Sequence, residues 1–472
     1  MNIYLVISVL DTLYNPLSAK LVSVLASPPG QPATAQNLTP TGNTGEYEIQ
    51  LPTGVTQFNF TVQQDGYFPV HQDLTLNAGP PPSLSYTSGV QELNVRNVGG
   101  HSRSGGDFNV TVAVVLGQLR DARADVDAVS SRYGMGKFGG VDPVTRPVMD
   151  FSSKTTLNAS GTGWNQFDHS MQSSVTPTGK MFYAERTTVP KLIAIYVPAG
   201  ITVTPSPSVD PQTKPLNFHL FYHPHPGHLQ GSYPFDWAFV DLICRYLFYC
   251  RFLHKEMVNQ QHAAGANPIM LFPVGDPSRW FDSLGSQAVI LRLLFEVKYF
   301  VQRMAKIPYP LQPVGKCALS AFSAGGIYLH QAINNTNSYF HHNVLTEVYG
   351  FDLRQVTPAA FASRLTAWFG AGKAYRIYTT DAGWNAVHTV DSGASQSSGP
   401  GGSLEWSGAS SSVVYVPFNN FWTNIWAATG RVTDFNTAPP GDYQVFRNSW
   451  DDVHQLIPAI FLEHALKNSS LK

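Results

Sequence analysis

The chain has 472 residues, of which 43% are hydrophobic and 13% carry a charge, and its formal net charge is −1. This length is enough for two or three domains with a large core. The charged fraction is about half of that usual in soluble domains, and no run of five or more basic residues occurs. We therefore exclude an electrostatic surface for nucleic acid and expect no nucleic-acid partner.

The first residues, "MNIYLVISVLDTLYNPLSAK", lack a positively charged start, and Asp11 interrupts a short apolar stretch. We interpret them as a strand and expect no signal peptide. The most apolar helical segment, 235–257, carries charged residues such as Asp241 and Arg245. It is expected to be a buried amphipathic helix and not a membrane span. The sequence predicts a soluble protein, located in the cytoplasm or exported without a cleaved signal.

Residues 1–96 are predicted to form a separate all-β domain. Short apolar stretches such as "IYLVISVLD" and "TQFNFTVQQ" alternate with clusters of Pro, Gly, Asn and Thr. That spacing is typical of a small β-sandwich. The following Gly- and Ser-rich stretch, "NVGGHSRSGGD" at 97–107, is predicted to be a linker.

Residues 108–472 are predicted to form the second domain, which begins with an irregular or β extension over 108–187. From about residue 188, stretches with strand character alternate with stretches that have helical spacing of apolar residues. This alternation predicts a mostly parallel sheet with helices on both faces. A Gly- and Ser-rich segment at 391–412 is expected to be a mobile surface loop.

Ser323 is the candidate nucleophile. It lies in "KCALSAFSAGG", where a strand pattern ends at the serine and a helical pattern follows. Small residues on both sides suit a sharp strand-to-helix turn, the arrangement known as a nucleophile elbow. The N-terminus of the following helix would also favour a developing negative charge.

The loop after "NFHLFY" begins with His223 and Pro224 and is the candidate oxyanion loop. Because prolines cannot donate, the backbone N–H groups of His225 and Gly227 are the available ones in this loop. That of His225 is predicted to be one oxyanion donor, and that of Ala324 the second. An alternative interpretation makes a metal cluster of the four histidines in this stretch. No carboxylate or cysteine accompanies them, so we expect no metal. The histidines are His219, His223, His225 and His228.

His454 is the candidate general base. It lies at the head of the last predicted helix, in "NSWDDVHQLIPAIFLEHAL", after the last predicted strand. A histidine in this position, following a candidate serine, suits proton transfer from that serine.

These segments, from about 188 to 470, resemble the α/β-hydrolase fold. The stretches that carry the resemblance are "LFYHPHPG", "SAFSAGG", "YTTD" and "DDVHQLIPAIFLEHAL". The resemblance implies a mostly parallel, helix-flanked sheet of the α/β-hydrolase type, preceded by the small all-β domain. By strand order in that family, the acid falls on Asp381, with Asp352 at the end of the preceding strand as the alternative. Ala321 and Pro224 depart from the usual glycines of the family motifs.

The predicted function is a serine hydrolase of the esterase or lipase kind, which cleaves carboxylic esters through an acyl-serine intermediate. Ser323, His454 and Asp381 are the predicted catalytic residues, and no cofactor is expected. The substrate is expected to be a small-molecule or lipid-like ester. A peptidase or amidase on the same fold is one alternative, and a non-catalytic binding protein that uses the N-terminal β domain is another. The sequence does not indicate an oligomeric state.

Overall fold

The computed structural model describes most of the chain, and every structural statement below refers to the described residues. By contacts along the chain it divides into two units, each treated by itself. Unit 1 comprises Met1–Arg120, Val203–Pro205 and Arg292–Leu311, and unit 2 the remainder. The described residues are 2–26, 31–87, 95–132, 179–198, 201, 215–224, 235, 257–304, 313–399, 403–416 and 450–472.

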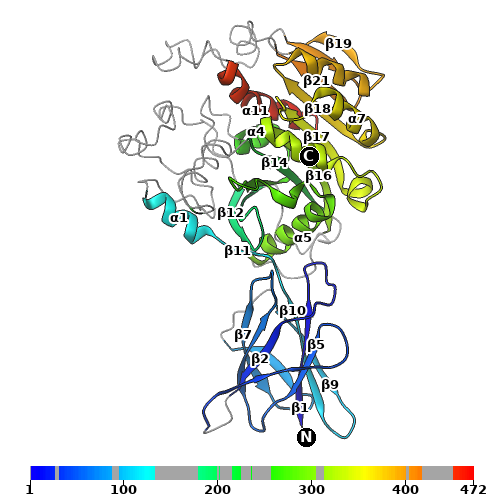
Figure 1. The fold of residues 1–472 in the computed structure, drawn as a ribbon. Helices are drawn as coiled ribbons and strands as arrows, with labels where there is room; N and C mark the ends of the chain where they lie inside the picture. Colours follow the sequence, from blue (N-terminus) through cyan, green and yellow to red (C-terminus); the bar gives the residue numbers. More distant parts are fainter. Residues whose placement is uncertain are drawn as a thin grey trace. The chain divides into compact units, whose positions relative to one another are not determined.

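Unit 1 contains two five-stranded sheets (Figure 1). Side chains alternate along the strands between core and solvent, as in β7, where every second residue is buried. Residues from both sheets, such as Leu5 and Phe60, share one hydrophobic core, so the sheets form a sandwich. The strands, in sheet order, are β4 (Thr39–Pro40), β5 (Glu46–Gln50), β1 (Ile3–Leu10), β10 (Phe108–Val115) and β9 (Val95–Ser102), then β3 (Thr34–Asn37), β2 (Leu21–Ala26), β6 (Gln57–Gln63), β7 (Val70–Asn77) and β8 (Ser83–Tyr86).

The segment predicted as a linker, 97–107, belongs to this sandwich. It contributes most of strand β9 and the turn to β10, which pairs antiparallel with β9 and parallel with β1. Gly105 and Gly106 both have a left-handed φ, which a tight hairpin turn requires. Glycine and serine therefore mark a hairpin here, and unit 1 continues past residue 96 to Arg120.

Unit 2 contains one eleven-stranded mixed sheet. Its six central strands, from β15 to β21 in sheet order, run parallel, whereas antiparallel strands continue it on both sides. The sheet order is β11 (Leu119–Asp121), β12 (Gly179–Arg186), β13 (Leu192–Pro198), β15 (Ile269–Val274), β14 (Leu216–Tyr222), β16 (Val314–Phe322), β17 (Leu345–Phe351), β18 (Ala374–Thr379), β21 (Ser411–Tyr415), β20 (Leu404–Ser407) and β19 (Ser395–Ser398).

The described helices are few beside these strands. Helix α11 packs against β17, β18 and α4, and α6 packs against β14 and β16. No described helix is long and apolar enough to cross a membrane. The helices are α1 (Arg123–Arg132), α4 (Met257–Ala263), α5 (Gln287–Met304), α6 (Gly326–Ala332), α7 (Pro358–Trp368) and α11 (Trp450–Lys467), with the short turns η5 (Asp282–Gly285), η6 (Ser323–Gly325), η7 (Phe340–Val344) and η8 (Ala382–Val390).

The predicted fold class is therefore wrong. The structure is 41% strand and 26% helix, and its sheets are antiparallel or mixed. It is not the mostly parallel, helix-flanked sheet of the α/β-hydrolase type. One physical reason lies in the expected loop 391–412: it supplies β19, β20 and the start of β21, and β19 and β20 extend the sheet by antiparallel pairing.

Candidate active site

Ser323 lies directly after strand β16, at the sharp turn into η6 and α6. Its φ is +52°, in the left-handed region that residues other than glycine rarely occupy. Such a conformation costs free energy and persists only where the surrounding structure imposes it. The Ser323 residue is half-buried, so it retains access to solvent.

Two close approaches explain the glycines after this serine. A Cβ atom on Gly325 would lie 2.5 Å from the carbonyl oxygen of Tyr222, at the end of β14. A Cβ atom on Gly326 would lie 3.3 Å from the carbonyl oxygen of Arg354. At 2.5 Å the added Cβ would clash with the carbonyl oxygen of Tyr222, which is a backbone atom and cannot rotate away as a flexible side chain could. The chain therefore needs glycine here to bring the turn against the ends of its neighbouring strands.

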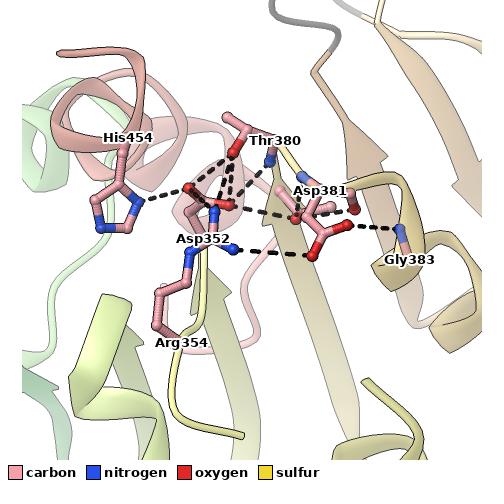
Figure 2. A network of polar contacts seen from close by, with 7 residues as sticks. Asp352, Arg354, Thr380, Asp381, Gly383 and His454 are labelled. Atoms are coloured by element: carbon pink, nitrogen blue, oxygen red, sulfur yellow. Dashed lines mark hydrogen bonds and ion pairs between the residues drawn. The ribbon is translucent and has the colours of Figure 1, made fainter. Parts of the chain in front are cut away.

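His454 is paired with a buried carboxylate. Its Nδ1 lies 2.5 Å from Oδ2 of Asp352, and both side chains are nearly excluded from solvent. Helix α11 supplies the histidine, and the residue after β17 supplies the aspartate (Figure 2). The imidazole also lies on the ring of Phe322, with centroids 4.6 Å apart. Phe322 directly precedes Ser323 in the chain, so His454 contacts the residue next to the candidate nucleophile.

Asp352 is held ionised by several donors. Its Oδ1 accepts a hydrogen bond from the Thr380 amide at 2.9 Å, and its Oδ2 accepts one from Arg354 Nη2 at 3.2 Å. Burial raises the pKa of this carboxyl. The hydrogen bond and charge of His454, the Thr380 amide and Arg354 outweigh burial and lower the pKa overall. An ionised acceptor at Nδ1 places the ring proton there and leaves Nε2 as the acceptor.

Asp381, the preferred acid of the sequence analysis, has other partners. Its Oδ1 accepts the Gly383 amide at 2.8 Å, which caps η8, and its Oδ2 lies 3.8 Å from Arg354 Nη1 (Figure 2). The Asp381 side chain is 44% exposed. The structure thus joins His454 to Asp352, whereas Asp381 contacts Arg354 and the Gly383 amide. Both aspartates follow neighbouring parallel strands, so sequence order alone does not separate them.

Arg354 is a site residue that sequence reasoning missed. Its backbone N–H donates to the carbonyl oxygen of Ser323 at 2.8 Å, while its guanidinium contacts Asp352 and Asp381. The sequence offers no signal that singles it out, because Asp121 and Arg123 form an ion pair at the same spacing.

Of the two residues predicted to donate to the oxyanion, one lies among the described residues. The residue Ala324 is buried in η6, immediately after the serine. The other predicted donor, His225, lies outside the described residues. Upstream of it, His223 is buried, with Nε2 accepting the Gly275 amide at 2.8 Å and Nδ1 lying 2.6 Å from the Pro224 carbonyl oxygen. The imidazole therefore ties the end of β14 to the end of β15.

The alternative metal interpretation is not supported by the two histidines that are described. His219 is fully buried, and its Nε2 lies 2.6 Å from Ser320 Oγ, whereas His223 has the backbone partners given above. Within the described parts of the chain, no group of three or more His, Cys, Asp or Glu side chains is placed to hold a metal ion. The histidine at 228 lies outside them.

The comparisons with known proteins show no family for this chain. No protein-family model matches the chain, and no curated protein matches it. Among solved structures, a hydroxyquinol 1,2-dioxygenase from Pseudomonas putida is similar, with 15% identity and a TM-score of 0.17. The match covers 25% of this chain and 56% of the dioxygenase. A likeness at that TM-score assigns neither fold nor activity.

Nothing in these findings supports membership of the α/β-hydrolase family. The predicted resemblance is therefore wrong, and neither a hydrolase activity nor a catalytic triad follows from it.

Proposed function

We propose that this chain cleaves carboxylic esters through an acyl-serine intermediate on Ser323. One observation carries the proposal: the imidazole of a buried His454–Asp352 pair contacts the ring of Phe322, and the next residue along the chain is a serine held in a left-handed turn. Serine at its ordinary pKa is a weak nucleophile, and an adjacent oriented imidazole is the usual means of activating it. Asp352, the alternative of the sequence analysis, takes the place of Asp381 in this proposal because it is the carboxylate bonded to His454.

The proposed reaction has two stages. First, His454 Nε2 takes the proton of Ser323 Oγ as the oxygen attacks the ester carbonyl, and the resulting imidazolium is stabilised by Asp352. The negative oxygen is received by the backbone N–H of Ala324, with that of His225 as the predicted second donor. His454 then returns the proton to the departing alcohol.

In the second stage, water replaces the alcohol. His454 removes a proton from the water, whose oxygen attacks the acyl-serine carbonyl. Collapse of this second intermediate breaks the acyl bond to Ser323, returns the proton to Oγ and releases the carboxylic acid. The imidazole of His454 accepts and returns the proton in both stages. The orientation of that ring therefore affects the rate of both stages.

Labelling with a fluorophosphonate probe tests this proposal, because the probe reacts with activated serines. Wild-type protein should be labelled, with mass spectrometry mapping the adduct to Ser323. The variant Ser323→Ala should lose the adduct and lose p-nitrophenyl ester cleavage by several orders of magnitude. The matched control is Ser283→Ala, which removes an exposed serine from η5 of the same unit and should be labelled as wild type is.

Two outcomes would overturn the proposal. One is an absence of labelling at Ser323 in folded wild-type protein. The other is retention of ester cleavage by purified Ser323→Ala. Parallel assays with aminoacyl anilides separate ester from amide cleavage: we expect turnover of esters, and turnover confined to anilides would assign the same serine to a peptidase or amidase.

A further inference from the structure

Arg354 connects the two halves of the candidate site. Its backbone N–H binds the carbonyl oxygen of Ser323, 2.8 Å away. Its guanidinium Nη2 donates to Asp352 Oδ2 at 3.2 Å, the same oxygen that receives His454 Nδ1. The other terminal nitrogen, Nη1, lies 3.8 Å from Asp381 Oδ2. Figure 2 shows the guanidinium beside both carboxylates.

The shared oxygen has an electrostatic consequence. A positive guanidinium on Asp352 reduces the negative potential that this carboxylate presents to His454, and so disfavours the imidazolium. Asp381 opposes this effect, since its negative charge partly neutralises the guanidinium. Arg354 and Asp381 are 29% and 44% exposed, so solvent weakens their mutual attraction while Asp352 remains buried.

The other charged groups around helix α11 have partners elsewhere. Glu347 of β17 and Arg376 of β18 form an ion pair with each other at 2.9 Å. Tyr378 of β18 contacts His464 at 2.8 Å. The remaining titratable residue of α4, His262, is exposed. Of α11 itself, the side chains of residues 451 and 452 lie outside the described ones. The carboxylate of Asp352, which is bonded to His454, and the contacts that Arg354 makes with Asp352 and Asp381 are the described interactions on which the inference rests.

We propose that Arg354 is a positioning residue that fixes the serine turn to Asp352, and that its pairing with Asp381 sets the pH at which His454 takes up a proton. This inference rests on the proposed function for its catalytic meaning. The electrostatic coupling itself is a property of the four side chains and can be measured without turnover.

The test is a double-variant cycle on His454. NMR follows the pH midpoint of the imidazole resonance in proteins labelled at histidine, with His454→Gln identifying the signal. Arg354→Gln should raise the midpoint by about 1 pH unit, because a positive charge is lost beside Asp352. Asp381→Asn should lower it by about 0.5 pH unit, because Arg354 is no longer neutralised. Asparagine still accepts the Gly383 amide, so this variant retains the helix cap.

The shifts in the pH midpoint caused by Arg354→Gln and Asp381→Asn should not be additive. Once Arg354 is replaced, Asp381→Asn should shift the midpoint by less than about 0.2 pH unit. Arg354→Lys, which keeps the charge, should titrate close to wild type. Unchanged midpoints in the single variants would overturn the inference, and so would an Asp381→Asn shift that persists in full without Arg354. An absence of fluorophosphonate labelling at Ser323 in folded wild-type protein would instead overturn the proposed function. The failure of the inference and the failure of the proposed function are therefore distinguishable.

Discussion

The backbone amide of Arg354 is hydrogen-bonded to the carbonyl oxygen of Ser323, at 2.8 Å. This bond joins the turn after β16 to the segment that follows β17, where Asp352 lies. A serine turn and an acid that come from neighbouring parallel strands are thus fixed to each other through backbone. Side-chain contacts then complete the arrangement, with His454 arriving from helix α11.

The two candidate acids should differ sharply in their effect on rate. Asp352→Asn removes the carboxylate that orients His454 and should lower kcat for ester cleavage by about 10³- to 10⁴-fold. Asp381→Asn should lower kcat far less at pH 8, because Asp381 caps η8 and contacts Arg354. Steady-state kinetics on the purified variants measure both. Equal losses would contradict the assignment of Asp352. Asp391→Asn, whose wild-type carboxylate accepts Ser411 Oγ at 2.6 Å, is the control and should retain wild-type kcat.

The glycine after the serine turn should not tolerate a side chain. Gly325→Ala would place Cβ 2.5 Å from the Tyr222 carbonyl oxygen, so the turn must shift. We expect a loss of about 1–3 kcal/mol in the free energy of unfolding and at least a tenfold slower labelling of Ser323. Gly370→Ala is the matched control because no atom lies within 4 Å of its added Cβ. Thermal denaturation and labelling rates test the pair, and similar behaviour of the two variants would contradict this account.

The buried imidazole of His219 should make stability depend on pH. Burial lowers its pKa to about 4, although the charge of Glu347 acts in the opposite direction. In the unfolded chain the value is about 6.5, so this group favours folding above that pH, and its contribution falls as the pH drops toward 4. The full loss is about 3 kcal/mol. Melting temperatures between pH 7 and pH 5 should fall more steeply for wild type than for His219→Gln. Parallel slopes would show that His219 protonates freely in the fold.

An ion pair in the core should hold the C-terminus to the sheet. The carboxylate of Glu347 accepts hydrogen bonds from Arg376 at 2.9 Å and from Ser470 through its amide at 2.6 Å. Glu347→Leu leaves a buried guanidinium unpaired and should cost about 3–5 kcal/mol in the free energy of unfolding. The double variant Glu347→Leu/Arg376→Met should recover part of that loss. As a control, Glu463→Gln removes a partly exposed pair with Lys467 and should cost less than about 1 kcal/mol. Urea denaturation measures all three, and a double variant no more stable than Glu347→Leu alone would contradict the coupling.

Local patterns predicted much of the element content. The apolar runs that end at Tyr222, Phe322 and Phe351 are strands β14, β16 and β17, since short apolar runs bounded by turn residues suit buried strands. The predictions from local patterns were wrong where the same composition suits both a loop and a strand. The Gly- and Ser-rich stretches at 97–107 and 391–412 predicted a linker and a mobile loop. Both instead take part in hairpins, because neighbouring strands supply the hydrogen-bond partners that composition does not reveal.

By itself, the sequence determined the serine turn: small residues around Ser323 between a strand and a helix are a local property, set by backbone sterics. It also placed His454 near the start of the last helix. Only the tertiary structure decided which aspartate meets that histidine and that Arg354 lies between the two candidates. The reason is physical. Asp352 and Asp381 follow adjacent parallel strands with similar local sequence environments, and pairing depends on where helix α11 crosses their ends, a relationship between segments about 100 residues apart.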